Sequence, residues 1–477
     1  MSSAPLCDRP AVDLRQMIGA KQISPRELLA DCQARIAEVN PTLNAVVAED
    51  GRAAAAAEAA EAAVLRGEDL GLLHGLPIGI KDLSETEGLT TTFGSPLYAD
   101  YVPKADDPLV TRLRQAGAII AAKTNTPEFG AGANTTNAVY GVTGNPFDPA
   151  LTCAGSSGGS AVAMATSMLP LCTGSDLGGS LRTPAAYCGI FGLRPTPGLV
   201  PDPAGLRIFS PLSVEGPMAR SLPDLRLLLQ VLAGHDRRCP LSRPFDPAAL
   251  SAPPADLSSM TVGFSEDLGI APVSEEVRGL FRQRVEALSP LFGQTDNVSP
   301  PLEDATWVFE TLRAVGFLAG FATLYQKDPQ QLGPNVRVNT ALGFERSAAD
   351  VAAAQVAHGK LYRAFLGLMD QVDVLICPVA SVQPFDKTKL YPDQIDGKPL
   401  QTYISWIAIT YAITLTGCPS LVLPCGLDEK GLPFGLQIVG KPWQEAKLLA
   451  FGESLEALLA SDPRYCRPIP DLKALAG

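Results

Sequence analysis

The feature that most constrains this chain is a pair of serine-bearing glycine turns, GSSGGS at residues 155–160 and DLGGS at residues 176–180. Glycine is costly to order, so such clusters are expected where the backbone reaches positive φ or approaches a ligand closely. Turns of this kind leave consecutive N–H groups free to bind an oxyanion or a phosphate. We place the active centre here, with a helix over residues 161–168 and a strand over residues 169–173 between the two turns.

Two other interpretations of these turns exist. GSSGGS is also a flexible-linker composition, but apolar and well-patterned segments lie on both sides of it. A glycine loop that opens a helix can also hold a phosphate. The chain contains neither G-x-x-x-x-G-K-[ST] nor a strand-initial G-x-G-x-x-G, so phosphate binding stays the weaker alternative.

The composition excludes several classes of protein. With 46% hydrophobic and 18% charged residues among 477, the chain is globular, and its net charge of −12 argues against a nucleic-acid partner. The ten cysteines include no C-x-x-C pair, which favours free buried thiols in a reducing compartment. No secretion signal begins the chain, and polar residues and prolines interrupt its most apolar stretch, residues 403–425. We therefore expect a cytoplasmic protein without a membrane segment.

Helical and strand patterns alternate along the chain without a long linker, which predicts a single α/β domain over residues 1–477 around one large sheet. Capping boxes begin at Ser24 and Ser347. Thr126 is predicted to cap a further helix, with Pro127 and Glu128 in its first turn. The predicted helices cover residues 25–39, 52–65, 108–115, 223–232, 274–288, 304–325, 347–369, 404–415 and 445–459. The predicted strands cover residues 77–80, 118–124, 192–195, 260–264, 372–377, 420–423 and 435–439.

Lys81 directly follows the apolar strand over residues 77–80 and precedes a polar, glycine-containing loop. Most lysines reach water, but this position is one at which α/β folds place chemistry. A serine nucleophile needs a base, and the three histidines, His74, His235 and His358, do not occur in a recognisable triad pattern; G-x-S-x-G is also absent. A lysine can serve instead if burial keeps it neutral.

Four ordered motifs now define a resemblance: Lys81-Asp82 followed by GLTTTFGS, then NTPEFG, then GSSGGS, then GSDLGGSLRTPAA. This series resembles the amidase signature family, whose members are serine hydrolases with a Ser-cisSer-Lys triad. Ser156 and Ser180 are 24 positions apart, as that family requires. The resemblance is dense over residues 74–198, the signature core, and continues in residues 211–221, 375–380 and 417–445. It implies a mixed central sheet with helices on both faces and a variable substrate-pocket region at about residues 235–370.

The resemblance implies that Ser180 forms the acyl-enzyme, that Ser156 follows a cis peptide bond and relays protons, and that Lys81 is the base. It assigns the oxyanion hole to the N–H groups of Leu177, Gly178, Gly179 and Ser180.

The resemblance also implies supporting residues and a pocket. Asp176 and Arg182 flank the nucleophile and are expected to brace its turn. The peptide Gly130, Ala131 and Gly132 and the helices over 304–325 and 404–415 are the candidates for substrate binding. Neither a metal nor a cofactor is expected. The sequence departs from the family at Ser175, where many members have threonine, and at Cys153-Ala154, where a glycine is common before Gly155.

We therefore expect an amidase that hydrolyses a small carboxamide or anilide through an acyl-enzyme on Ser180, with esters as side substrates. The alternative is the glutamine-hydrolysing A subunit of a tRNA-dependent amidotransferase, but residues 192–217 do not resemble that protein's characteristic block. Intact triad positions argue against a non-catalytic scaffold. The partner is expected to be a small amide; the family also allows a homodimer. The low aromatic content and the lack of an evident charged clamp slightly favour an apolar or aryl acyl group.

Overall fold

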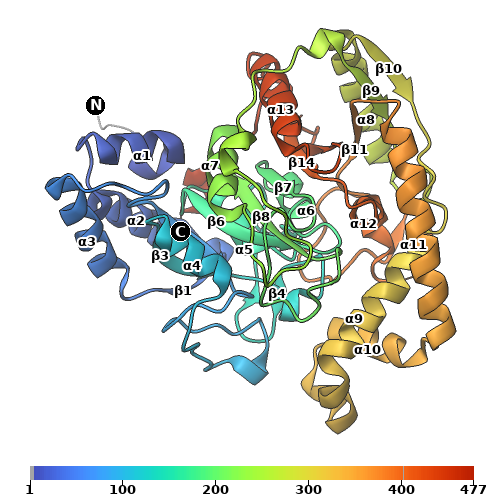
Figure 1. Ribbon diagram of the computed structural model, residues 1–477, viewed down its shortest axis with the longest axis horizontal. Coiled ribbons are helices and arrows are strands. Elements are labelled where there is room, and N and C mark those ends of the chain that lie inside the picture. The colour runs from blue at the N-terminus through green and yellow to red at the C-terminus, as the bar shows by residue number, and fades with distance from the viewer. Residues whose placement is uncertain (1–4, 401, 477) are drawn as a thin grey trace.

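The computed structural model describes residues 5–400 and 402–476, and these form a large mixed sheet of eleven strands with helices around it (Figure 1). Strand β2 lies between its parallel neighbours β3 and β6, and β9 lies between its parallel neighbours β10 and β11. The other neighbouring pairs are antiparallel. In spatial order the strands are β1 (Val46–Glu49), β3 (Ile119–Thr124), β2 (Pro77–Lys81), β6 (Leu171–Asp176), β8 (Val214–Ala219), β7 (Phe191–Arg194), β14 (Ser420–Leu427), β15 (Pro433–Val439), β11 (Val374–Pro378), β9 (Thr261–Phe264) and β10 (Gln294–Asn297).

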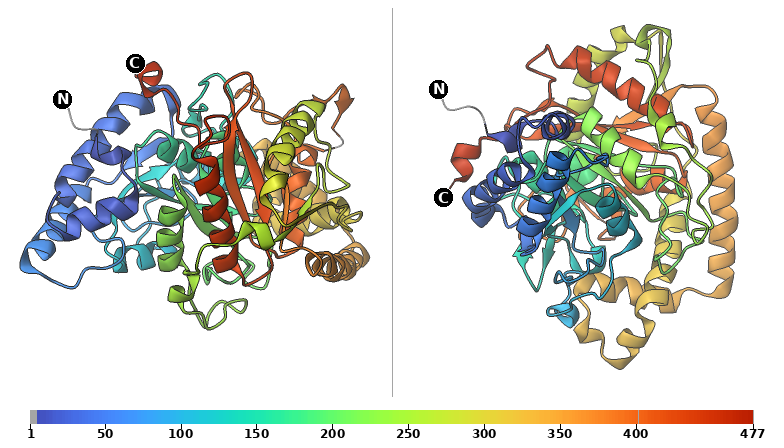
Figure 2. Two further views of the ribbon diagram at one scale, coloured as in Figure 1. Left: turned by 90° about the horizontal axis from the view of Figure 1, so that it is seen from above. Right: turned by 60° about the vertical axis from the view of Figure 1, so that its left-hand side comes forward.

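The helices surround this sheet, and the first three and the ninth to eleventh lie at opposite sides of the molecule (Figures 1 and 2). Two short hairpins complete the fold, β4 (Thr136–Asn137) with β5 (Gly141–Val142) and β12 (Gln394–Ile395) with β13 (Lys398–Pro399). The helices are α1 (Ala11–Gly19), α2 (Pro25–Leu43), α3 (Ala53–Arg66), α4 (Pro108–Gln115), α5 (Gly158–Ala165), α6 (Thr183–Tyr187), α7 (Leu222–Leu232), α8 (Glu275–Leu288), α9 (Ala305–Lys327), α10 (Pro334–Glu345), α11 (Ala348–Met369), α12 (Ala408–Leu415), α13 (Glu445–Leu459) and α14 (Leu472–Leu475).

Helices cover both faces of the sheet. A Cβ added at Gly192 of β7 would meet Ala185 of α6 at 2.9 Å, whereas one added at Gly452 of α13 would meet Leu421 of β14 at 2.5 Å. Leu421 pairs with Leu193, the residue after Gly192. Because successive residues of a strand face opposite sides, α6 and α13 pack on opposite faces. The predicted fold class is confirmed.

Most of the predicted elements are present, with boundaries shifted by a few residues. Both capping boxes form, at Ser24 and at Ser347. Helix α5 begins at Gly158, three residues earlier than predicted, and β6 extends to Asp176. The predicted helix after Thr126 is wrong: only a 3₁₀ turn forms, Glu128–Gly130, because Phe129 adopts a φ of 49°. Helices α1, α6, α10 and α14 are absent from the sequence-based prediction.

Helix α9 is long and apolar enough to cross a membrane by length and composition alone. In this fold it packs against α10, α11 and α12, and Val308, Phe309 and Ala314 are fully buried. The core helix of a globular domain gives the same compositional signal.

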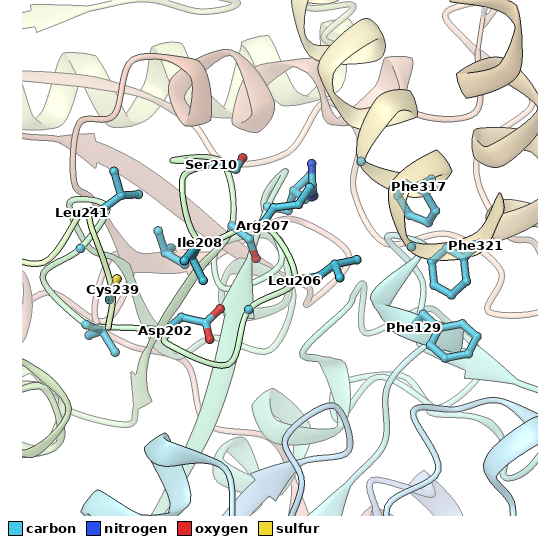
Figure 3. Close-up of a pocket in the computed structure, with 18 residues that line it drawn as sticks. Phe129, Asp202, Leu206, Arg207, Ile208, Ser210, Cys239, Leu241, Phe317 and Phe321 are labelled. Carbon is cyan, nitrogen blue, oxygen red and sulfur yellow. The ribbon is translucent and has the colours of Figure 1, made fainter. Parts of the chain in front are cut away.

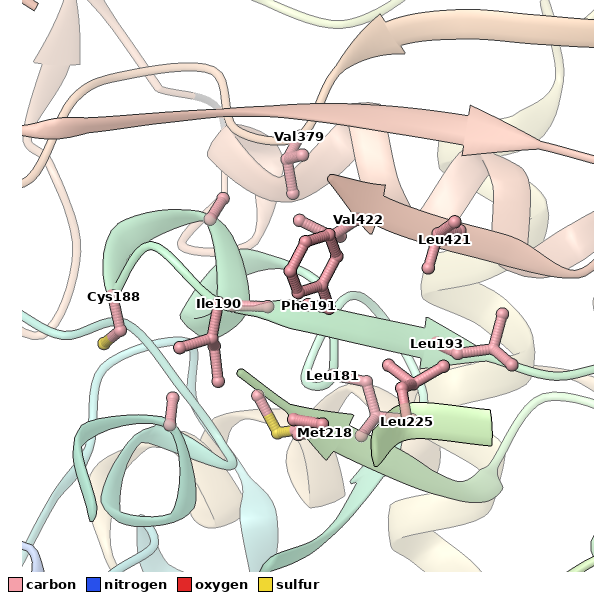
Figure 4. Close-up of a cluster of buried hydrophobic side chains, with 14 of the residues drawn as sticks. Leu181, Cys188, Ile190, Phe191, Leu193, Met218, Leu225, Val379, Leu421 and Val422 are labelled. Atoms are coloured by element: carbon pink, nitrogen blue, oxygen red, sulfur yellow. The ribbon is translucent and has the colours of Figure 1, made fainter. Parts of the chain in front are cut away.

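Most of the buried apolar side chains form one large core that includes the central strands (Figure 4). Phe191 of β7 lies there beside Ile190, Val422 and Val379, and its side chain is fully buried. Such close-packed interiors tolerate the loss of volume poorly.

We expect Phe191→Ala to destabilise the protein by about 3–5 kcal/mol, because the substitution removes a ring and leaves a cavity. The measurement is the urea concentration at the midpoint of unfolding. Leu65→Ala is the control, since Leu65 is 65% exposed on α3 and its truncation should change stability by no more than about 0.5 kcal/mol. Equal midpoints for the two variants would contradict this description of the core.

Candidate active site

The site lies where two parallel strands end. Lys81 is the last residue of β2, and Ser175 and Asp176 are the last residues of β6, which pairs with β2 in parallel. The carboxyl ends of parallel strands meet at one edge of a sheet, where α/β folds commonly bind their ligands. The turn that carries Ser180 therefore begins next to Lys81.

The amine of Lys81 is surrounded by hydroxyl groups. Its Nζ lies 2.7 Å from Ser156 Oγ, 2.9 Å from Ser157 Oγ and 2.9 Å from Ser175 Oγ. The side chain is 1% exposed, and no carboxylate within the described residues forms an ion pair with it. The sequence alone does not single out the hydroxyls of Ser157 and Ser175 as contacts of this lysine.

Burial sets the charge state of this lysine. Removal from water lowers the pKa of Lys81 to about 7, although the carboxylates of Glu215 and Asp176 act in the opposite direction. An ammonium group with an ordinary pKa would be fully charged at neutral pH, whereas the lowered pKa makes the neutral amine of Lys81 accessible there.

The turn before α5 holds Ser156 against Lys81. The peptide bond between Gly155 and Ser156 is cis, as the family resemblance implies, and Ala154 has a φ of 60°. A Cβ added at Gly158 would overlap Thr135 Oγ1 and approach Cys153 Sγ, so no side chain fits there. Close packing against the loop over residues 133–135 thus explains why this turn is rich in glycine.

The carboxylate of Asp176 braces the second turn. It accepts hydrogen bonds from the Gly179 and Leu181 N–H groups at 2.9 and 3.1 Å, and from Arg182 Nε and Nη2 at 2.9 Å each. Burial alone would raise the pKa of Asp176, but the guanidinium groups of Arg182 and Arg194 outweigh that effect and hold it well below its usual range. The bracing geometry predicted for Asp176 and Arg182 is present.

The four amides proposed for the oxyanion hole differ in their availability. The Gly179 N–H donates to Asp176 Oδ1 in this structure, and its assignment to the oxyanion hole stays a prediction. The N–H groups of Leu177, Gly178 and Ser180 donate no hydrogen bond to any residue that the structure describes. Gly179 has a φ of 128°, which a residue with a side chain rarely adopts.

Ser180 lines a small cavity of about 30 Å³ next to these amides. Its Oγ forms no hydrogen bond with Ser156 within the described residues, although the Ser157 N–H donates to the Ser180 carbonyl at 3.3 Å. The structure thus brings Lys81 and Ser156 into direct contact and places Ser180 beside them. The cavity is also lined by Gly130, Gly132, Ala133, Gly155, Leu177, Gly178, Gly179, Thr183, Phe309, Arg313, Leu390, Tyr403, Ile404, Trp406 and Ile407.

The three residues predicted to bind the substrate, Gly130, Ala131 and Gly132, do not all line the same cavity. Gly130 and Gly132 line this cavity, but Ala131 does not: it packs with Leu332 and Val336 in a small separate cluster and lines a different pocket. Both predicted pocket helices contribute, through Phe309 of α9 and through the residues just before α12.

Several contacts of the site come from parts of the chain far from its motifs. Thr410 Oγ1 donates to the Gly178 carbonyl at 2.6 Å, and Arg313 reaches the cavity from α9. Residue spacing gives no signal for these contacts, because they depend on how the last third of the chain packs.

The histidines are engaged elsewhere. His74 Nε2 pairs with the Ala60 carbonyl at 2.9 Å, His358 Nε2 pairs with the Leu415 carbonyl at 2.8 Å, and His235 is exposed. Across residues 5–400 and 402–476, no group of three or more His, Cys, Asp or Glu side chains is placed to hold a metal ion. All ten cysteines are free, and nine of them are buried.

Comparison with known proteins identifies the class. The model of the amidase family matches residues 27–449, so the chain belongs to the amidase signature family. It is similar to the A subunit of the glutamyl-tRNA(Gln) amidotransferase of Chloroflexus aurantiacus, with 36% identity over 92% of this chain and 94% of that one. It is also similar to an acylamidase of Rhodococcus erythropolis, with 31% identity over 94% and 95% of the two chains. A bacterial aryl acylamidase structure superposes with a TM-score of 0.87 at 26% identity, covering 95% of this chain and 96% of that one.

We expect Asp176→Asn to lower stability by about 3–5 kcal/mol at neutral pH, because it leaves two buried guanidinium groups without their counter-charge. Asp176, Arg182 and Arg194 are all 0% exposed. The depressed pKa means that this contribution is complete above the pKa of an unfolded aspartate and is lost only as the pH falls towards the folded pKa.

The measurement is thermal unfolding, with Asp236→Asn as the control. Asp236 pairs with Arg238, which is 63% exposed, and surface ion pairs contribute little. An Asp176→Asn protein that unfolds at the same temperature as the control would contradict the bracing role.

Proposed function

We propose that this chain is an amide hydrolase that acts without a partner and cleaves a small carboxamide or anilide to a carboxylic acid and an amine or ammonia. The observation that carries the proposal is the buried amine of Lys81, 2.7 Å from Ser156 Oγ, beside the cavity that Ser180 lines. Membership of the amidase family supports hydrolysis of a C–N bond.

The proposed base is the neutral amine of Lys81. A neutral amine has two N–H donors and one lone pair, so one of its three hydroxyl neighbours must donate to it. We assign the N–H groups to Ser157 and Ser175 and the lone pair to Ser156, whose Oγ is the nearest of the three oxygens. This arrangement points the basic lone pair at the proposed relay serine.

Proton transfer then activates the nucleophile. Lys81 takes the proton of Ser156, Ser156 takes the proton of Ser180, and Ser180 Oγ attacks the amide carbonyl. This step needs Ser180 Oγ within hydrogen-bond distance of Ser156 Oγ, a contact that substrate binding is expected to complete. Catalytic hydrogen bonds are often longer without substrate than in the reactive complex.

The tetrahedral intermediate carries a negative charge on the former carbonyl oxygen. We propose that the free N–H groups of Leu177, Gly178 and Ser180 stabilise this charge, because they are fixed in a turn and need no reorganisation. The Gly179 N–H contributes indirectly by its hydrogen bond to Asp176, which fixes the turn.

The relay runs backwards to complete the reaction. Ser156 returns a proton to the departing nitrogen, because an amide anion is a poor leaving group, and the C–N bond breaks. Water then enters, gives its proton to the same relay and attacks the acyl-enzyme on Ser180, which frees the acid. An ester forms the same acyl-enzyme, so we propose esterase activity as well.

The second candidate function is the glutamine-hydrolysing A subunit of a tRNA-dependent amidotransferase. The 36% identity to the Chloroflexus protein favours it. The similarity to an acylamidase and to the aryl acylamidase structure supports the amidase that acts alone. The two functions share the proposed chemistry and differ in substrate and in the need for a partner.

We expect Lys81→Met to reduce kcat on a chromogenic anilide by about 100- to 10,000-fold, the contribution usually made by a general base. Lys430→Met is the matched control, because Lys430 is 65% exposed and forms a surface ion pair with Glu276. Full activity of Lys81→Met would remove the proposed base.

The pH dependence tests the protonation state. Because the neutral amine is the active form and its pKa is about 7, kcat/KM should rise with pH below 7 and level off above it. The measurement is kcat/KM for a neutral anilide from pH 5 to about 9. If kcat/KM keeps rising over this whole range, as expected for a lysine with its ordinary pKa of about 10, burial does not set the pKa of the base.

Partner dependence separates the two functions. We expect the purified chain alone to hydrolyse members of an anilide panel, with glutamine as a poorer substrate. If every anilide were inert and glutamine released ammonia only after co-purified proteins were added, the amidotransferase function would replace the one proposed.

A further inference from the structure

A second and larger cavity, of about 370 Å³, adjoins the cavity that Ser180 lines (Figure 3). Leu177 lines both, and Phe129, which lines the larger cavity, is next in sequence to Gly130, which lines the smaller. One wall is the loop over residues 198–213 and the opposite wall is the middle of α9, from Gly316 to Phe321. A substrate bound at Ser180 can therefore extend into this space.

Arg207 brings a positive charge into the larger cavity without a counter-charge. Its guanidinium rests on Gly316 of α9, since a Cβ added there would overlap it. The side chain is half-buried, and it forms no ion pair or hydrogen bond with any residue in the part of the chain that the structure describes. Burial and the nearby charge of Arg313 lower the pKa of Arg207. The surroundings of Arg207 therefore disfavour its charged form.

Arg313 is a second cation at this place. It lies on α9, one turn before Gly316, the residue that the Arg207 guanidinium contacts. It is 6% exposed and lines the smaller cavity. Its Nη1 donates to Asn339 Oδ1 at 3.0 Å and to the Tyr403 hydroxyl at 3.1 Å, and both partners are neutral. Within the described residues no carboxylate forms an ion pair with it. A buried cation is costly unless something neutralises it.

The acidic residue in the cavity does not pair with Arg207. Asp202 lies on the other side of the loop, and its carboxylate and the Arg207 guanidinium point in different directions in Figure 3. The Asp202 carboxylate instead lies against the backbone of Gly205, since a Cβ added there would approach its Oδ2 to 2.5 Å. Among the described residues, Arg207 and Arg313 thus face this cleft without a carboxylate at ion-pair distance.

Three aromatic rings line the α9 side of the cavity. Phe129 and Phe321 have ring centroids 4.7 Å apart, Phe317 and Phe321 are 5.8 Å apart, and the Arg313 guanidinium lies 4.8 Å from the Phe317 centroid. Figure 3 shows the three rings together on one side of the cavity, opposite Leu206 and Ile208. The cavity thus offers an apolar surface with a cation at its edge.

We propose that the substrate is an amide that carries an anionic group, a carboxylate in its simplest form, which binds Arg207 and Arg313 while the apolar body of the substrate packs on Phe129, Phe317 and Phe321. This inference rests on the proposed amide hydrolysis at Ser180 and names the class of substrate. A guanidinium fits a carboxylate through two parallel hydrogen bonds, which makes it selective for such a group.

The test compares matched amides that differ in one charge. In the first pair the charge lies on the acyl part: glutaric acid mono-4-nitroanilide, which carries a carboxylate, is compared with the neutral pentanoyl 4-nitroanilide. In the second pair the charge lies on the amine part: N-acetyl-4-aminobenzoate, which carries a carboxylate, is compared with the neutral acetanilide. The readout is the ratio of kcat/KM for the anionic and the neutral member of each pair. We expect a ratio above about 10 in at least one pair.

Three variants assign the preference to the cavity. Arg207→Gln should reduce the ratio at least tenfold, and Arg207→Lys, which keeps the charge, should retain most of it. Arg363→Gln on α11 is the control, because Arg363 is exposed and should leave the ratio unchanged. Thermal unfolding of each variant shows whether it is folded. A ratio near 1 in both pairs, or one that Arg207→Gln does not change, would overturn the proposal.

A binding measurement tests the preference for an anionic substrate independently of the proposed hydrolysis. Calorimetry on Ser180→Ala measures the affinity of the same four compounds without turnover, and we expect the anionic member to bind at least tenfold more tightly and to lose that advantage in Ser180→Ala/Arg207→Gln. If neutral amides are hydrolysed as well as anionic ones and the reaction depends on Ser180, the proposal of an anionic substrate is wrong but the proposed amide hydrolysis stands. Turnover that persists in Ser180→Ala would overturn the proposed function instead.

Discussion

The site depends on a lysine that is removed from water and given hydroxyl groups in place of a carboxylate. An ion-pair partner would keep Lys81 charged, whereas burial among Ser156, Ser157 and Ser175 lowers its pKa to about 7. The parallel pairing of β2 with β6 contributes to this environment, because it brings Lys81 at the end of β2 close to Ser175 near the end of β6. The fold therefore provides a buried amine that we propose as the base, without a histidine.

The second constraint is the buried charge of Asp176. It forms ion pairs with both Arg182 and Arg194 and accepts hydrogen bonds from two backbone amides of the turn that carries Ser180, so ionic and hydrogen-bonding contacts together hold this turn. Breaking such a cluster is costly because it leaves uncompensated buried charge. One of these contacts engages the Gly179 N–H, whereas the N–H groups of Leu177, Gly178 and Ser180 have no partner among the described residues.

The sequence predicts what is local and misses what is assembled at long range. The strand before Lys81 and the turn of Ser180 are recognisable because hydrophobic runs and glycine patterns determine them. Helix α10 is missed, since its polar and apolar residues show little periodicity and its position depends on packing against α9 and on contacts with Ala131 and Tyr403. The arginines at the cleft are missed for another reason: an arginine without an acidic partner is evident only when all of its neighbours are known.

The most direct test of the central claim is the identity of the acylated residue. The protein is mixed with an excess of a 4-nitrophenyl ester, quenched in acid within the first turnover, digested and analysed by mass spectrometry. The account predicts one acyl group per chain, on the peptide that contains Ser180, formed more slowly in Lys81→Met and absent in Ser180→Ala. An acyl group on Ser156 or on a cysteine, or Ser180 acylated equally fast without Lys81, would contradict it.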